Sequence, residues 1–158
     1  MLLVSGWPVT DLHVATADEV IAHLGLELLE GEGCWYRLLW NNGSGNAIYG
    51  MVTPEAFSAL HVLAEDELWV HVAGEPVDLL ILHPDGTSQR VVLGKGVGHV
   101  PSILVPAGSW QGASVATGWG LFVCALAPAF TGFALATPEH DFSAWSQDAD
   151  RILELIRG

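Results

Sequence analysis

Between residues 34 and 136 the chain alternates short apolar segments with clusters of glycine, proline, asparagine and aspartate. The segments are four to eight residues long, the usual length of a β-strand. Turn signals such as Asn42-Gly43 and Asp85-Gly86 separate them. Eight to ten strands at this regular spacing predict an all-β sandwich or barrel. The expected strands are 34–40, 47–52, 57–63, 67–72, 77–82, 90–93, 102–105, 112–116 and 120–127, with 130–136 as a further candidate.

Helical patterns flank these segments at both ends of the chain. Residues 16–29 carry apolar residues at helical spacing behind Thr16, and Glu19 stands where a capping box needs it. Gly25 weakens that prediction. Residues 141–157 are also expected to be helical, with one apolar face made by Ile152, Leu153 and Ile156.

Composition limits the domain count and the partners. A chain of 158 residues, 51% of them hydrophobic, fits one globular domain over 1–158. Its 18 acidic residues against 5 basic ones leave a net charge of -13, which disfavours nucleic acid and anionic membranes as partners. Cys34 and Cys124 are expected to be buried free thiols, though a disulfide stays open. Residues 1–9 lack the pattern of a signal peptide, so we predict a cytoplasmic protein.

Two spaced motifs carry a family resemblance. His61 is followed two residues later by Leu63, then by Glu67 and Gly74. This resembles the first cupin motif, His-x-His, three or four residues, Glu, six residues, Gly, with Leu63 in place of the second His. The run from Pro106 to Gln111 resembles the second motif, Pro-x-Gly-x-x-His, with Gln111 in place of the His.

A narrower resemblance covers roughly residues 16–136. The words SALHVLAEDELWVHVAGEPVDLLILHPDG, VPAGSWQGA and CALAPAF, with the segment from Glu32 to Arg37, are similar to the fifth cupin family, a domain of unknown function. The resemblance implies a cupin jelly-roll barrel, or double-stranded β-helix, with its core at about 34–136 and a helix at each end. It also implies a homodimer. In outline the site resembles that of cupin-like sugar-nucleotide epimerases.

Side chains alternate along a strand, which predicts the lining of the barrel. If His61 points inward so does Leu63, and if Glu67 points inward so do Trp69 and His71. We expect an apolar pocket that binds a small molecule, with a few convergent polar groups. The candidate catalytic residues are Glu67 and His61; the candidate substrate-binding residues are Trp69, His71, Gln111, Tyr49, Leu63, Tyr36 and Arg37.

The resemblance implies a metal site of three histidines and one acid, and this chain keeps His61 and Glu67 of that set. Leucine cannot bind a metal, and a glutamine amide is a poor ligand for a transition ion. We therefore predict no cofactor and no tightly bound metal. If a metal is bound, its ligands are His61, Glu67 and Gln111, and His71 could complete the site.

A carboxylate and an imidazole in a dry pocket suit proton transfer. The leading hypothesis is a cofactor-free enzyme of the isomerase, epimerase, dehydratase or cyclase type. Two alternatives stay open, a passive small-molecule-binding cupin and a metal-dependent cupin oxygenase or isomerase. His61 and Glu67 could also serve the barrel structurally, through hydrogen bonds to the backbone.

Overall fold

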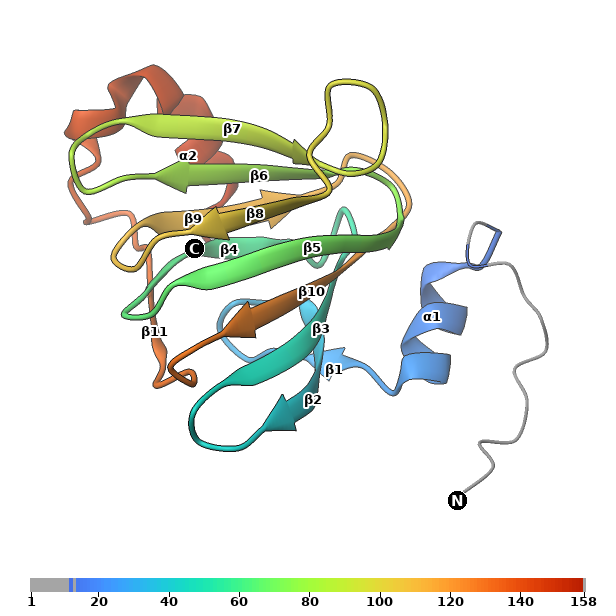
Figure 1. The fold of residues 1–158 in the computed structure, drawn as a ribbon. Helices are drawn as coiled ribbons and strands as arrows, with labels where there is room; N and C mark the ends of the chain where they lie inside the picture. The colour runs from blue at the N-terminus through green and yellow to red at the C-terminus, as the bar shows by residue number, and fades with distance from the viewer. Residues whose placement is uncertain (1–11, 13, 158) are drawn as a thin grey trace.

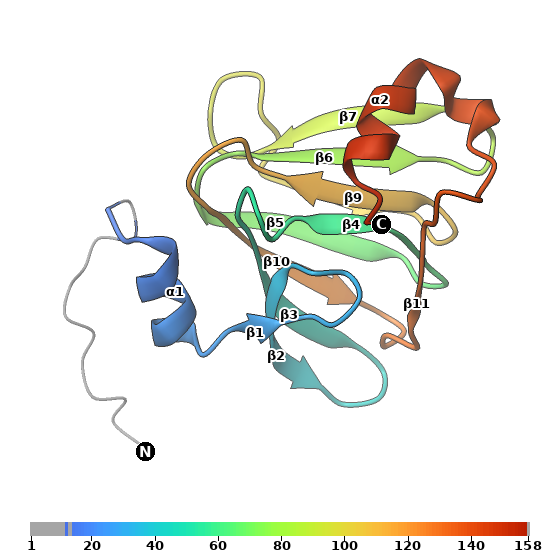
Figure 2. The ribbon, with the colours of Figure 1, turned by 180° about the vertical axis from the view of Figure 1, so that it is seen from behind.

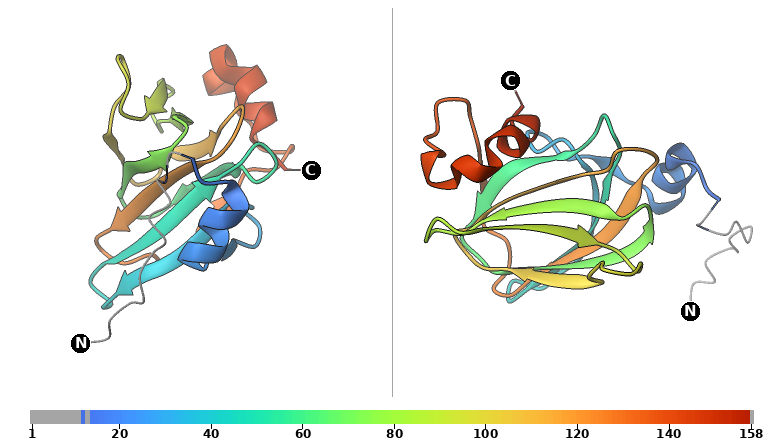
Figure 3. Two further views of the ribbon diagram at one scale, coloured as in Figure 1. Left: turned by 90° about the vertical axis from the view of Figure 1, so that its right-hand side faces the viewer. Right: turned by 90° about the horizontal axis from the view of Figure 1, so that it is seen from above.

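The computed structural model describes residue 12 and residues 14–157, and it contains two antiparallel β-sheets packed face to face as a barrel (Figure 1). The six-stranded sheet has the order β1-β2-β3-β10-β5-β8, and the five-stranded sheet has the order β11-β4-β9-β6-β7. Seen along its length, the barrel is enclosed by the two curved sheets (Figure 3). The prediction that residues 1–9 are not a signal peptide concerns residues outside the described part of the chain.

The strand prediction is confirmed, with small shifts at the ends. A two-residue strand that was not predicted, β1, precedes the others. The strands are β1 Glu27–Leu28, β2 Trp35–Asn41, β3 Asn46–Val52, β4 Ser58–Leu63, β5 Glu67–Gly74, β6 Val77–Leu82, β7 Ser88–Leu93, β8 Ser102–Val105, β9 Trp110–Ser114, β10 Gly120–Leu126 and β11 Phe133–Leu135.

The N-terminal helix is shorter than the sequence pattern predicts. Helix α1 spans Ala17–Leu24, and Thr16 and Glu19 form the expected capping box. Gly25 ends the helix because it adopts a left-handed conformation with φ of 63°. Residues beyond it turn into β1 instead of continuing the helix, so the prediction of a helix to residue 29 was wrong. In Figure 2, α1 lies beside β1, and its Val20 belongs to the same buried cluster as Met51 and Leu121 of the six-stranded sheet.

The C-terminal segment packs on the outer face of the five-stranded sheet (Figure 2). It consists of a 3₁₀ segment, η1 Ser143–Asp148, and helix α2 Ala149–Glu154. Ile152 and Leu155 are buried against Leu60 and Leu80 of the sheet. Leu153 is exposed, so its assignment to the apolar face was wrong: the buried residues are Ile152 and Leu155, and in a helix of 3.6 residues per turn the residue after Ile152 points to another side. No helix among the described residues is long and apolar enough to cross a membrane.

The side chains between the two sheets form the main core and leave polar groups inside it. Trp69 and Phe122 pack with ring centroids 4.5 Å apart. Cys34 and Cys124 are buried and unpaired, which confirms the expectation of free thiols. Because helix α2 covers the outer face of β4, both faces of that strand are buried, and His61 faces the barrel interior.

Candidate functional site

A cavity of about 300 Å³ opens from the barrel interior. Its wall is mostly aromatic and aliphatic, and its polar groups are two carboxylates, one imidazole, two thiols, two amides and one phenol. The lining residues are Leu29, Glu32, Cys34, Tyr36, Leu38, Asn41, Asn46, Ile48, His61, Leu63, Glu67, Trp69, Phe122, Cys124, Leu126, Phe130 and Phe133. This combination of an apolar body and a few polar groups is typical of small-molecule sites.

Glu67 is held by a hydrogen-bonded chain that crosses from one sheet to the other. The indole Nε1–H of Trp69 donates to Oε1 of Gln111 at 2.7 Å, and Nε2 of Gln111 donates to Oε2 of Glu67 at 2.6 Å. Because an indole N–H can only donate, Trp69 determines which end of the Gln111 amide faces Glu67. All three side chains are buried, so this chain fixes the position of the carboxyl group.

Burial raises the pKa of the Glu67 carboxyl above its ordinary value. The charge of Glu32 raises the pKa further, whereas His61 and the hydrogen bonds from Gln111 and Cys124 lower it, and desolvation outweighs these. A carboxyl whose pKa is shifted toward neutrality can both release and accept a proton.

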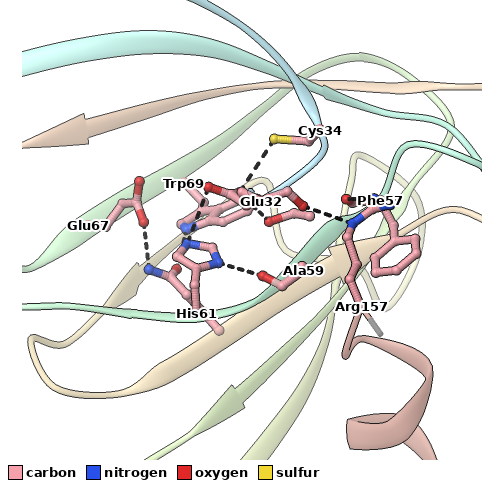
Figure 4. A network of polar contacts seen from close by, with 10 residues as sticks. Glu32, Cys34, Phe57, Ala59, His61, Glu67, Trp69 and Arg157 are labelled. Atoms are coloured by element: carbon pink, nitrogen blue, oxygen red, sulfur yellow. Dashed lines mark hydrogen bonds and ion pairs between the residues drawn. The ribbon is translucent and has the colours of Figure 1, made fainter. Parts of the chain in front are cut away.

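His61 is held with one ring nitrogen directed into the site (Figure 4). Its Nδ1 lies 2.7 Å from the carbonyl oxygen of Ala59, two residues earlier on the same strand. A carbonyl oxygen only accepts, so Nδ1 carries the proton, and in the neutral imidazole Nε2 keeps its lone pair. The ring packs edge-on against Phe133, with centroids 5.8 Å apart. His61 is therefore a positioned proton acceptor.

Glu32 stands behind the free nitrogen of His61, with Oε2 3.8 Å from Nε2 (Figure 4). Its Oε1 accepts hydrogen bonds from the Ser58 hydroxyl at 2.6 Å and from the Cys34 thiol at 3.4 Å. Its backbone carbonyl accepts from the N–H of Ala59 and from Nε of Arg157. The carboxylate is placed to stabilise an imidazolium at His61.

Two glycines explain why Glu32 can enter the barrel. Gly31 and Gly33 both have positive φ, at 87° and 90°, and a Cβ at Gly33 would lie 2.5 Å from the guanidinium of Arg157. The sequence analysis used Glu32 only as part of the segment that resembles the family and did not predict it as a site residue. The glycines on both sides of this acid were the sequence feature that could have indicated its position in the site.

The predicted site residues separate into three groups. Five line the cavity: Glu67, His61, Trp69, Leu63 and Tyr36. Gln111 lies behind the wall as the link between Trp69 and Glu67. The remaining three are not lining residues: His71 points its Nε2 at the carbonyl of Glu75, Tyr49 packs with the cluster beside α1, and Arg37 donates to the carbonyl of Leu24.

The polar groups do not fit the metal that cupin barrels commonly hold. Gln111 uses its amide oxygen for Trp69 and its amide nitrogen for Glu67, and it is not among the residues that line the cavity. Leu63 has no donor atom. Across residues 12 and 14–157, no three His, Cys, Asp or Glu side chains are arranged to hold a metal ion.

The barrel and its pocket define the class of protein, a small cupin. The chain belongs to the family described as Cupin superfamily (DUF985), whose profile matches residues 18–137. Among curated proteins none matches the chain.

Several solved structures share the fold of this chain. A hypothetical protein from Leishmania major is 26% identical, with a TM-score of 0.83, covering 91% of this chain and 100% of that one. A protein from Shewanella oneidensis is 28% identical with the same TM-score, covering 90% and 98%. The polyketide cyclase RemF from Streptomyces resistomycificus shares the fold at 14% identity, with a TM-score of 0.54 and coverage of 84% and 92%.

Proposed function

We propose that this cupin is a small-molecule enzyme that moves a proton by acid-base chemistry without a metal or organic cofactor. The observation that carries the proposal is the pair formed by His61 and Glu67 in one apolar cavity. His61 offers a lone pair at Nε2, and burial raises the pKa of Glu67. Two groups whose environments differ in this way suit the roles of base and acid.

The reaction that fits these groups is enolisation of a carbonyl compound. His61 Nε2 takes the proton from the carbon beside the carbonyl, while protonated Glu67 gives its proton to the carbonyl oxygen. The C–H bond breaks, its electron pair forms the C=C bond of the enol, and the C=O bond becomes C–OH. Protonation of the opposite face of the same carbon gives an epimer, and protonation of another carbon gives an isomer. A hydroxyl proton then goes back to Glu67, which restores both side chains. Glu32, 3.8 Å from Nε2, stabilises the imidazolium formed on the way.

Solvent deuterium exchange tests this function without knowledge of the natural substrate. We expect the protein, after dialysis against a chelator, to catalyse loss of the α-proton NMR signals of a neutral ketone such as 4-phenylbutan-2-one in D₂O. Removal of one acid-base group typically costs about 10²–10⁴ in rate. Glu67→Gln and His61→Gln should therefore each lose at least about 100-fold.

Glu139→Gln is the matched control for this assay. It makes the same change at an exposed carboxylate that does not line the cavity, so it should exchange as fast as the unmodified protein. If the ketone binds and no exchange exceeds that in buffer, or if Glu67→Gln exchanges normally, the enzyme proposal is wrong.

The second candidate function is a passive binding module. The observation that favours it is the mainly apolar cavity, which would hold a small molecule without any proton transfer. Binding of the ketone with no exchange in any variant would select this function.

The homodimer implied by the family resemblance stays a prediction. Strand β1 pairs with β2 only at Trp35 and Tyr36, which leaves the outer edge of β2 from residue 37 onward without a strand partner in the described chain. Leu38 and Trp40 on that edge are about half exposed. Sedimentation of the purified protein decides whether a second copy covers them.

A further inference from the structure

The charges in the cavity restrict which molecules can enter it. Glu32 and Glu67 are both buried there, with 7% and 6% of their surface exposed. No lysine or arginine is among the described residues that line the cavity. His61 is the one lining group that can gain a positive charge, and that charge would face Glu32.

The basic residues of the chain are committed outside the cavity. Arg157 directs its guanidinium to the backbone carbonyls of Glu32 and Phe57 and stacks over the Phe57 ring at 3.9 Å (Figure 4). The other four bind elsewhere: Arg37 at the carbonyl of Leu24, Arg90 at Asp148, Lys95 at the carbonyl of Val72 and Arg151 at Glu154. Among the described residues, an anion in the cavity could pair only with His61, which already faces Glu32, and burying an unpaired charge is costly.

The two carboxylates do not form an open site for a cation either. Glu67 accepts from the Gln111 amide, with the Cys124 thiol beside it, and Glu32 accepts from Ser58 and Cys34. These donors are neutral side chains of the protein, so both carboxyl groups already have hydrogen-bond partners without a cation.

The residues that line the cavity indicate which kind of ligand fits it. Trp69, Phe122, Phe130 and Phe133 supply aromatic surface, and the volume of about 300 Å³ is at the small end of ligand pockets. We infer that the substrate is an uncharged carbonyl compound with one aromatic or alicyclic ring, and that carboxylates and phosphate esters are excluded. This inference rests on the proposed function and names its substrate class.

Three probes of equal size and different charge test the inference. They are 4-phenylbutan-2-one, 3-phenylpropionate and 3-phenylpropylamine, which carry a neutral, a negative and a positive end on the same ring and linker. Affinities are measured at pH 8 by titration with NMR detection. We expect the ketone to bind at least about tenfold more tightly than the carboxylate, with the amine no tighter than the ketone.

Charge variants separate the cavity from the acidic surface as a whole. Glu32→Gln and Glu67→Gln should each narrow the gap between ketone and carboxylate by at least about threefold, whereas Glu139→Gln, an equal charge change on the surface, should leave it unchanged. Two variants are used because either one could disturb the local fold; each is checked by its thermal unfolding.

Two outcomes would overturn the inference: equal binding of ketone and carboxylate, or an amine that binds tenfold more tightly than the ketone and so reveals a cation site. These outcomes are independent of the exchange assay. A ketone that binds selectively but does not exchange its protons removes the enzymatic proposal and leaves the charge selection in place. If the ketone exchanges its protons and the carboxylate binds equally well, the enzymatic proposal stands and the charge selection is wrong.

Discussion

Replacing Gln111 with leucine tests how the buried carboxyl of Glu67 is held. The side chain keeps nearly the same volume, but the amide between Trp69 and Glu67 disappears. Leaving the indole N–H without an acceptor costs about 1–3 kcal/mol, and losing a hydrogen bond to a charged group costs about 1.5–3 kcal/mol. The added apolar surface returns about 1 kcal/mol. We expect the free energy of unfolding at pH 8.5 to fall by about 1.5–5 kcal/mol.

The deficit should depend on pH, because the bond from Gln111 lowers the pKa of Glu67 and its removal raises that pKa further. A folded-state pKa above the unfolded value of about 4.5 contributes stability at low pH, and that contribution is lost as the pH rises through the folded-state pKa. The variant should therefore lose more stability at pH 8.5 than at pH 5.5, where the contribution of Trp69 dominates.

Chemical denaturation followed by tryptophan fluorescence at the two pH values measures this difference. Gln89→Leu is the control, because that amide lies in an exposed position beside His83, and its replacement should cost less than about 0.5 kcal/mol. A deficit for Gln111→Leu below about 1 kcal/mol at pH 8.5, or one of equal size at both pH values, would refute the reasoning.

Three further predictions use other positions. Leu63→His combined with Gln111→His should restore histidines at the motif positions and tighten Ni²⁺ binding by at least about 100-fold in calorimetry, and an unchanged affinity would contradict that assignment. Burial raises the pKa values of Cys34 and Cys124 well above 9.0. At pH 8 both thiols of the folded protein should therefore react with a thiol reagent at least about 100-fold more slowly than in denaturant. Fast labelling of the folded protein would contradict this prediction. Gly74→Ala should destabilise the protein by about 2–4 kcal/mol in the same denaturation assay, since φ is 78° and the new Cβ would lie 2.3 Å from a backbone carbonyl; a loss below about 1 kcal/mol would show that the turn relaxes.

The strands were predictable because each is a local pattern. Alternation and turn residues place the apolar runs of β3 to β6 within a residue or two of their observed bounds. The N-terminal helix failed at one residue, Gly25, where a left-handed cap competes with a helical period that continues to Leu28. At the C-terminus the sequence shows the apolar residues, but only the packing on the sheet shows that Ile152 and Leu155 are buried and Leu153 is not.

The site was predictable in part for the same reason. His61, Leu63, Glu67 and Trp69 line one cavity because alternation along β4 and β5 assigns them to inner faces. The same alternation predicted that His71 points inward, and His71 is buried. It does not line the cavity, because it lies nearer the end of β5 away from Glu67 and contacts the carbonyl of Glu75. The alternation of side chains along a strand predicts which face of the sheet a residue is on, but not how far along the barrel the cavity extends.

By itself the sequence determined the all-β barrel, the burial of both cysteines and the presence of one acid and one imidazole on inner faces, because these follow from neighbours along the chain. The tertiary structure alone decided that Glu32 joins His61, since the two are 29 positions apart and meet through a loop shaped by two glycines. It also decided that Gln111 supports Glu67, because a hydrogen bond between the two sheets exists only once the barrel has closed.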